Sequence, residues 1–440
     1  MKVALRFVLF VLAALFVTAA IAIVLIVKLV LAPAPGEWSQ RVEAGPIGFD
    51  VGVPTVLRLA TASWFAPQLA GRSFDTRFGT LRFGWSQANV LELDCAPCSV
   101  AVPALGDKPV QVERLLLTVR RDVDSMFGTV RAIPLGATRS ELRGRWSGRL
   151  TQKNLQLSAD IEDAPIGQWY QLLVPALPEL ARARIGGTAS VRGQLSLPEG
   201  SYSLQPRLVK FTVDGLGTEG LIEARASSCG APARLASDAW LARGAVAALD
   251  PDFFQHAGYQ PTGLARSGGG NASASASAIA SAGAKPEKVS TARGAAGPAP
   301  QGTLNEQMVR LLLPPLPQPE AQRLRDLLYA VELDRTPGKA RLLQAYLDMA
   351  PWGGQLCGAE SAARRYFKRS ARSLEPAQAI WMATLLREPD TLLAKWRTEG
   401  QIDKPRARQV AEAVREITAG QRVALLRSVA NARFAPPPAP

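Results

Sequence analysis

The first hydrophobic pattern in the chain is a continuous apolar run near its start. Residues 7–27 contain no charged side chain and, at about 1.5 Å per residue, are long enough to cross the roughly 30 Å hydrocarbon core of a bilayer. Lys2 and Arg6 precede the run, which by the positive-inside rule places residues 1–6 in the cytoplasm. We therefore predict one transmembrane helix at 7–30. The alternative is a cleaved signal peptide, whose apolar core is usually shorter, about 7–15 residues.

The next region, residues 40–230, alternates apolar and polar positions. Segments such as 155–161 and 209–213 show a period of two, which is typical of antiparallel strands with one buried and one solvated face. Gly and Pro interrupt these segments at short intervals. We predict a β-rich domain that also contains one or two short helices, near residues 60–69 and 169–180.

The hydrophobic period becomes helical in the last part of the chain. From residue 302 onward we predict a series of helices, with Thr303 and Glu306 as a capping box that opens the first of them. Residues 266–301 are rich in Ala, Ser and Gly and lack aromatic side chains, so we expect a mobile low-complexity insert there. The proline-rich residues 431–440 predict a disordered tail.

Composition narrows the class of protein. The chain has 440 residues, 47% hydrophobic and 20% charged, which excludes a disordered chain and favours two or three domains. The 51 Lys and Arg outnumber the 37 Asp and Glu, and the net charge of +14 favours anionic partners. Because the bulk of the chain is predicted to lie outside the cytoplasm, we expect membrane lipid and lipid-linked phosphates rather than nucleic acid. The single histidine, His256, excludes a multi-histidine metal site.

The four cysteines fall into two sets. Cys95 and Cys98 lie between strand-like segments and predict a disulfide that closes a turn in an oxidising compartment. A thioredoxin-like redox pair would instead need a helix N-terminus here, and a zinc site would need two further ligands. Cys229 and Cys357 remain as a second pair that could join across the helical domain.

The β-rich half loosely resembles the periplasmic domains of the AsmA-like family. The resemblance rests on the alternating pattern alone, as in residues 80–85 and 189–192. It implies an open, curved sheet with an apolar inner face. Lipid transfer along a groove of that sheet is accordingly one function to consider.

Five segments of the helical half resemble, in order, the sequence boxes of the family 51 glycosyltransferases, the peptidoglycan transglycosylases. They are residues 250–258 (DPDFFQHAG), 302–310 (GTLNEQMVR), 323–326 followed by 333–335 (RLRD and LDR), 339–348 (KARLLQAYLD) and 358–367 (GAESAARRYF). The resemblance implies a membrane-anchored α+β protein: one N-terminal transmembrane helix, the β-rich periplasmic domain, and a helical lysozyme-like transglycosylase domain over residues 236–430.

The resemblance also implies a reaction. The substrate would be lipid II, a disaccharide-pentapeptide on a polyprenyl pyrophosphate. A glutamate acts as general base on the acceptor hydroxyl, and the pyrophosphate leaves with inversion at the anomeric carbon. Basic side chains and, in some accounts, a divalent cation such as Mg²⁺ hold the pyrophosphate; no other cofactor is implied.

The motif positions assign candidate roles residue by residue. Alignment on Phe253 and His256 places Leu249 at the position of the family's catalytic glutamate and Asp250 at the acidic position beside it. Asp326 matches the second catalytic carboxylate. The candidate substrate-binding residues are Gln307, Arg310, Arg323, Arg325, His256 and Glu306.

Leu249 stands where the family has its catalytic glutamate, and leucine cannot accept a proton. Loss of a general base typically lowers the rate about 10²–10⁴-fold. We therefore expect a catalytically impaired domain. Several candidates also have a structural alternative: Asp250 as a helix cap, His256 as a buried polar group, and Asp326 as the partner of a neighbouring arginine.

Two functions follow from the sequence. The first is a peptidoglycan glycosyltransferase-like domain that acts on or binds lipid II or a glycan strand at the inner membrane, with the N-terminus in the cytoplasm and the bulk of the chain in the periplasm. The second is a non-enzymatic scaffold that binds cell-wall synthesis or envelope proteins, membrane lipid or glycan.

Overall fold

The computed structural model describes most of the chain after the predicted membrane helix. The described residues are 29–44, 47–76, 78–86, 89–100, 109–135, 141–175, 177–226, 229–260, 266–268 and 302–438. The transmembrane prediction at 7–30 lies almost wholly outside them, as does the insert at 266–301 apart from its first three residues. Within the described part of the chain, no helix has both the length and the hydrophobicity required to cross a bilayer.

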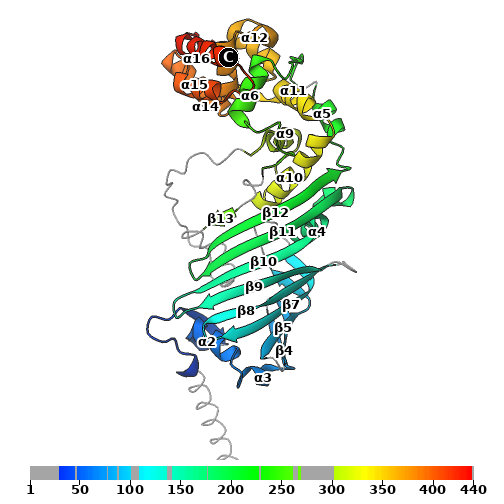
Figure 1. Cartoon of the computed structure of the whole chain (residues 1–440), viewed down its shortest axis with the longest axis vertical. Coiled ribbons are helices and arrows are strands. Elements are labelled where there is room, and N and C mark those ends of the chain that lie inside the picture. The colour runs from blue at the N-terminus through cyan, green and yellow to red at the C-terminus, as the bar shows by residue number, and fades with distance from the viewer. Residues whose placement is uncertain are drawn as a thin grey trace, which may run out of the picture.

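One antiparallel sheet forms the body of the N-terminal half (Figure 1). Its strand order is β13-β12-β11-β10-β9-β8-β7-β5-β4-β3, with β6 paired to β7. The strands are β3 (Ser73–Thr76), β4 (Gly79–Ser86), β5 (Val90–Cys95), β6 (Cys98–Val100), β7 (Val110–Asp122), β8 (Ser125–Pro134), β9 (Leu142–Leu150), β10 (Leu155–Pro165), β11 (Arg184–Leu197), β12 (Ser201–Asp214) and β13 (Arg266–Gly268). The β-rich prediction is therefore confirmed. Likeness to the AsmA-like family stays a prediction.

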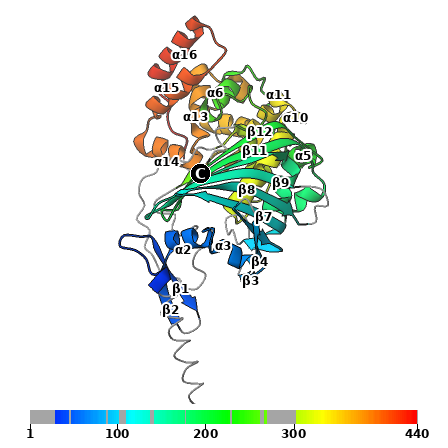
Figure 2. The same ribbon diagram turned by 60° about the horizontal axis from the view of Figure 1, so that its bottom comes forward.

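The sheet has an apolar face that short elements cover at one end. The buried side chains of this face form one cluster, made of Ala66 and the strand residues Leu91, Val119, Leu150 and Leu155. Side chains of a strand alternate between the two faces, so residues of matching register share this face. Figure 2 shows α2 and α3 on this side of the sheet, above the two-stranded sheet of β1 and β2. These elements are α2 (Val53–Ala60), α3 (Ala66–Leu69), β1 (Ser39–Ala44) and β2 (Ile47–Gly52).

The C-terminal half is helical, as predicted. Its core contains Trp352, Trp381 and Trp396, each at most 1% exposed. The predicted capping box is present, with the Thr303 hydroxyl accepting from the Glu306 amide at 3.2 Å. The helices are α6 (Trp240–Leu249), α9 (Leu304–Leu312), α10 (Pro319–Arg335), α11 (Lys339–Met349), α12 (Ala359–Phe367), α13 (Pro376–Leu385), α14 (Pro389–Glu399), α15 (Lys404–Ala413) and α16 (Ala419–Asn431).

A continuous core joins the two halves. The apolar cluster of the helical half extends onto α4 (Ile166–Leu173) and β12. The carboxylate of Glu332, on α10, accepts from the backbone amides of Leu216 and Gly217 at 2.8 and 3.1 Å, just beyond the end of β12. The Tyr170 hydroxyl on α4 donates to the Leu324 carbonyl at 2.9 Å. The helical domain is therefore fixed to the far end of the strands from α2 and α3 (Figure 1).

Glu332→Ala should loosen this junction. The variant leaves the buried Leu216 amide and the partly buried Gly217 amide without their acceptor, which we expect to cost about 2 kcal/mol of stability. Limited proteolysis should then cut the segment from Gly215 onward about tenfold faster, as mapped by mass spectrometry. Asp214→Ala, which removes only an exposed ion pair with Arg335 at 3.4 Å, is the control and should cut like the unmodified chain. Equal cleavage of the Glu332 variant would contradict this role.

The four cysteines form two disulfides, and the C-terminal residues pack against the helical half. Disulfides join Cys95 to Cys98 and Cys229 to Cys357. The expected disorder of 431–440 is wrong for the described residues up to 438, because the Phe434 ring packs against the ring of Phe367 with centroids 5.1 Å apart. Phe434 thus holds the tail against α12, although the proline-rich composition of the tail predicts no such contact.

Candidate functional site

Asp250 lies at the C-terminal end of α6, and buried donors surround its carboxylate. Its Oδ2 accepts from His256 Nε2 at 2.8 Å and from the backbone amide of Leu304 at 2.9 Å, while Oδ1 accepts from Gln260 at 3.4 Å. The residue is only 2% exposed. Asp250 therefore ties α6, the following turn and the start of α9 together, and both carboxylate oxygens accept hydrogen bonds from described residues.

His256 has a defined hydrogen-bonding state in this arrangement. Its Nδ1 accepts from the Gly258 amide at 3.2 Å, so a neutral ring carries its proton on Nε2 and donates it to Asp250. Leu249, one residue before Asp250, packs its side chain against the apolar core of the domain. Leu249 thus places an aliphatic side chain at the position that the resemblance assigns to a general base. The acid next to it, Asp250, already accepts three hydrogen bonds.

The start of α9 explains the role of Glu306. Its carboxylate accepts from the Thr303 amide at 3.1 Å, and the Thr303 hydroxyl donates to the Gly258 carbonyl at 2.8 Å. Glu306 therefore acts in helix capping. Gln307, the next residue, accepts from the Tyr346 hydroxyl on α11 at 3.1 Å.

Asp326 and Arg310 form an ion pair between α10 and α9. Arg310 Nε lies 3.1 Å from Asp326 Oδ2, with the carboxylate 2% exposed and the guanidinium side chain 50% exposed. Gln322, one turn earlier on α10, donates its amide to the other carboxylate oxygen. Burial raises the pKa of Asp326 above the usual aspartate range, and the hydrogen bond and charge of Arg310 oppose this shift.

The two arginines that precede Asp326 on α10 face different surroundings. Arg323 is exposed and pairs with Glu320 one turn away at 2.9 Å. Arg325 is 5% exposed and donates to the Pro314 carbonyl and, at 3.1 Å, to Gln322. Two positions along a helix do not share a face, so these residues do not form one phosphate clamp.

The structure thus brings together only part of the candidate set. Arg310 and Asp326 are in contact, and Gln307 lies one turn before Arg310 on α9. Asp250, with His256, is held inside the fold. Sequence reasoning did not identify Gln322 as a partner of Asp326, although its i,i+4 spacing on a predicted helix is the signal that would have found it.

The described residues do not fit the divalent cation that the resemblance suggested. The oxygens of Asp326 already accept from Arg310 and Gln322, and those of Asp250 already accept from three donors. Over the described ranges, no cluster of three or more His, Cys, Asp or Glu side chains could hold a metal ion.

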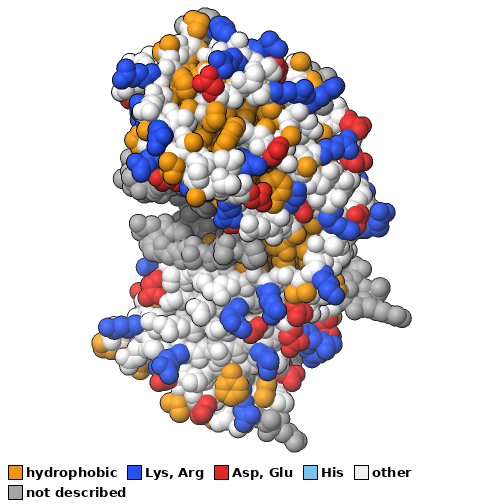
Figure 3. Space-filling view, turned by 45° about the horizontal axis from the view of Figure 1, so that its top comes forward, with side chains coloured by type: hydrophobic (Ala, Val, Ile, Leu, Met, Phe, Trp, Pro, Cys, Tyr) orange, Lys and Arg blue, Asp and Glu red, His pale blue; other side chains and the backbone are white. Residues whose placement is uncertain are grey.

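The positive charge is spread over the surface. On the face drawn in Figure 3, Lys and Arg side chains are scattered over both the helical half and the sheet, with Asp and Glu between them. The net charge of +14 therefore does not concentrate in one patch on this face.

Comparisons with known proteins agree with the helical half of the fold. Residues 236–415 match the family model described as Transglycosylase. The biosynthetic peptidoglycan transglycosylase of Thiobacillus denitrificans is 29% identical over 149 residues, which cover 34% of this chain and 56% of that protein. The corresponding protein of Nitrosomonas europaea is 36% identical over 87 residues, or 20% of this chain and 36% of that protein. The chain thus spans about half the length, or less, of these curated relatives.

Proposed function

Since residues 236–415 match the transglycosylase family model, we propose that this chain binds lipid II or a peptidoglycan glycan strand and converts lipid II into glycan chains slowly or not at all. The family match and the names of the relatives support a peptidoglycan glycosyltransferase-like function. The finer claim, binding with impaired chemistry, is our own inference from the arrangement of side chains.

The observation that carries the proposal is the state of the first catalytic box. Leu249 cannot take a proton from the acceptor hydroxyl, and Asp250 beside it already accepts hydrogen bonds from His256, Leu304 and Gln260. If Asp250 acted as a base, these donors would lose their acceptor inside the fold. Each buried donor left without a partner costs about 1–3 kcal/mol of stability. The domain therefore lacks a base at the position where the transfer reaction needs one.

Arg310 is the group best placed to hold an anion. Its guanidinium is half exposed on α9 while its partner Asp326 is buried, so the cation faces solvent. A pyrophosphate would offer a stronger, doubly charged acceptor than the Asp326 carboxylate, and arginine binds such oxygens in a bidentate manner. Substrate would then compete with Asp326 for Arg310.

We place this binding at the outer surface of the inner membrane, with residues 7–30 as a single anchor and the bulk of the chain in the periplasm. The apolar run and the basic residues before it support this placement. The Cys95–Cys98 and Cys229–Cys357 disulfides fit an oxidising compartment.

A second candidate is an active transglycosylase that uses Asp326. Burial raises the pKa of this carboxyl, and a raised pKa is the property of a general acid. A non-enzymatic scaffold for cell-wall synthesis or envelope proteins is a third candidate, and the continuous core between sheet and helices would suit it.

Binding of lipid II to the detergent-solubilised full chain tests the proposal. We expect saturable binding that Arg310→Gln weakens about tenfold, because the substitution removes the solvent-facing cation. Arg408→Gln, which removes one exposed charge paired with Glu412 on α15, is the matched control and should bind normally. Absence of lipid II binding, or equal affinity in the Arg310 variant, would contradict the proposed site.

A further inference from the structure

Two rows of side chains, all polar except one phenylalanine, cross five strands of the sheet at its hairpin end. Directly opposed residues of paired strands point to the same face, so the strand register defines each row. The first row is Phe127, Ser147, Ser158, Gln194 and Ser203. The second row is Ser125, Arg149, Gln156, Ser196 and Ser201.

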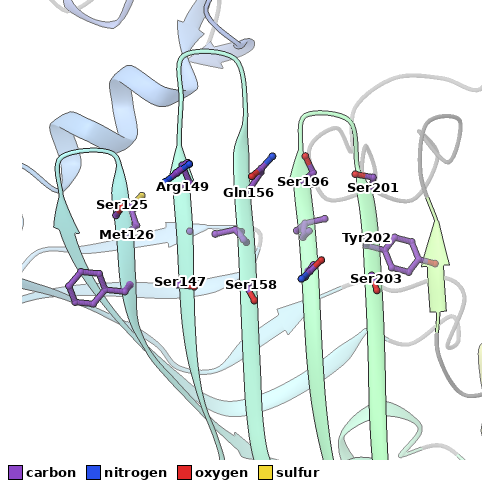
Figure 4. Close-up of a pocket in the computed structure, with 15 residues that line it drawn as sticks. Ser125, Met126, Ser147, Arg149, Gln156, Ser158, Ser196, Ser201, Tyr202 and Ser203 are labelled. Carbon is purple, nitrogen blue, oxygen red and sulfur yellow. The ribbon is translucent and has the colours of Figure 1, made fainter. Parts of the chain in front are cut away.

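The rows form a shallow track rather than a point. They are two residues apart along each strand, or about 7 Å, and five strands wide, or about 19 Å. A hollow of about 700 Å³ borders these ten residues and the row between them, whose side chains alternate to the other face of the sheet: Met126, Gly148, Leu157, Leu195 and Tyr202. Figure 4 shows the hollow across β8 to β12, with at least one labelled serine on each of these strands.

Most polar side chains of the track have no hydrogen-bond partner among the described residues. Ser196 donates to Glu199 at 2.6 Å. None of the other polar side chains in the two rows forms a hydrogen bond or ion pair with a described residue. Within the described ranges, Arg149 is thus an unpaired cation, and no Asp or Glu lines the hollow. Such a lining is complementary to a ligand with many hydroxyls and some negative charge.

The exposed aromatic ring of Phe127 is a second feature of the track that suits ligand binding. Phe127 shares the face of the serines and is 42% exposed, whereas the buried cluster of Leu91, Val119, Leu150 and Leu155 lies on the opposite face. An aromatic ring beside hydroxyl and amide groups provides a flat apolar surface together with hydrogen-bonding partners. This combination suits a sugar ring, which has an apolar face and a polar rim.

We propose that the track binds an acidic glycan, that is, a chain of several sugar rings bearing carboxylates. Phe127 would stack on one ring, the serine and glutamine side chains would bond the hydroxyls, and Arg149 would pair with a carboxylate. The choice of a glycan rests in part on the proposed function, but the site is separate from the helical domain.

The track lies far enough from the helical domain to act as a second attachment point for a glycan strand. It lies at the hairpin end of the strands near α2, whereas the helical domain is fixed to their other end, about 40 Å away along β12. A glycan strand held on the track would therefore be anchored to the same molecule at a second point, and two linked sites raise the apparent affinity for a long strand.

Calorimetric titration of the full chain with soluble, uncrosslinked glycan strands that lack pyrophosphate tests the site. We expect Phe127→Ala to weaken binding at least tenfold, and Arg149→Gln to weaken it about fivefold. Binding of neutral N-acetylglucosamine oligomers should be sensitive to Phe127→Ala but not to Arg149→Gln, because only the carboxylates need the guanidinium.

Two control variants separate binding at the track from a general effect of losing an exposed ring or charge. Phe74→Ala removes a similarly exposed ring from β3, and Arg143→Gln removes a cation from the same face of β9 about 20 Å from Arg149. Both should bind glycan normally. All four substitutions change exposed side chains, so each variant should keep the unfolding temperature of the unmodified chain.

Two results overturn the track. One is unchanged glycan affinity in the Phe127 and Arg149 variants, and the other is a lack of any glycan binding by the full chain. Failure of the proposed function has a different signature: lipid II is not bound, or is bound equally by the Arg310→Gln variant, while glycan strands still require Phe127 and Arg149.

Discussion

Replacing Leu249 with glutamate should raise the rate of glycan-chain formation from lipid II by about 100-fold or more. The substitution places a carboxylate at the last residue of α6, where the family resemblance puts the general base, and a positioned base contributes about 10²–10⁴-fold. The substitution leaves Asp250 and its three donors, His256, Gln260 and the Leu304 amide, unchanged. Chain formation is measured with labelled lipid II and gel separation of the products.

Leu249→Gln is the matched control for this gain. Glutamine has nearly the shape and polarity of glutamate but cannot act as a base at neutral pH, so we expect no increase in rate. If both variants polymerise lipid II equally, the gain comes from local loosening of α6 rather than from proton transfer. If neither does, Leu249 is not what limits the reaction.

Asp250→Ala should be among the most destabilising single changes in the helical domain. It removes the acceptor for His256, Gln260 and the Leu304 amide within the fold, and we expect a loss of about 2–4 kcal/mol in the free energy of unfolding. Urea unfolding followed by tryptophan fluorescence measures the change, since three tryptophans lie in the core of this domain.

Asp252→Ala provides the comparison for that result. Asp252 is half exposed and pairs only at the surface with Arg415 at 2.7 Å, so its loss should cost under about 1 kcal/mol. A small effect of Asp250→Ala, similar to that of Asp252→Ala, would contradict the structural role. It would also reopen Asp250 as a group available for chemistry.

The sequence predicted the kinds of element well because their patterns are local. The period-two segments of residues 155–161 and 209–213 became strands β10 and β12, and Thr303 with Glu306 opened α9 as a capping box. The tail was misjudged, because its packing depends on Phe434 meeting Phe367 and no local pattern reports that contact.

The site was only partly predictable for a related reason. Motif order could align Leu249 and Asp326 with family positions, but it could not show that Asp250 accepts from three donors in two other segments, which is a property of tertiary structure. Likewise, Arg323 and Arg325 look equivalent in the sequence, whereas the helix turns one toward solvent and the other into the fold. The track on the sheet depends on strand register, which the alternating pattern alone does not specify.

A polymerisation assay on the unmodified full chain tests the central claim most directly. Labelled lipid II is supplied in detergent in excess over the chain, so that a donor and an acceptor can occupy the same domain, and samples taken over hours are analysed for bound substrate and for glycan products. Our account predicts saturable binding of lipid II while chains longer than the starting disaccharide stay near the level of the enzyme-free control. Rapid conversion of the bound lipid II into long glycan chains would contradict it.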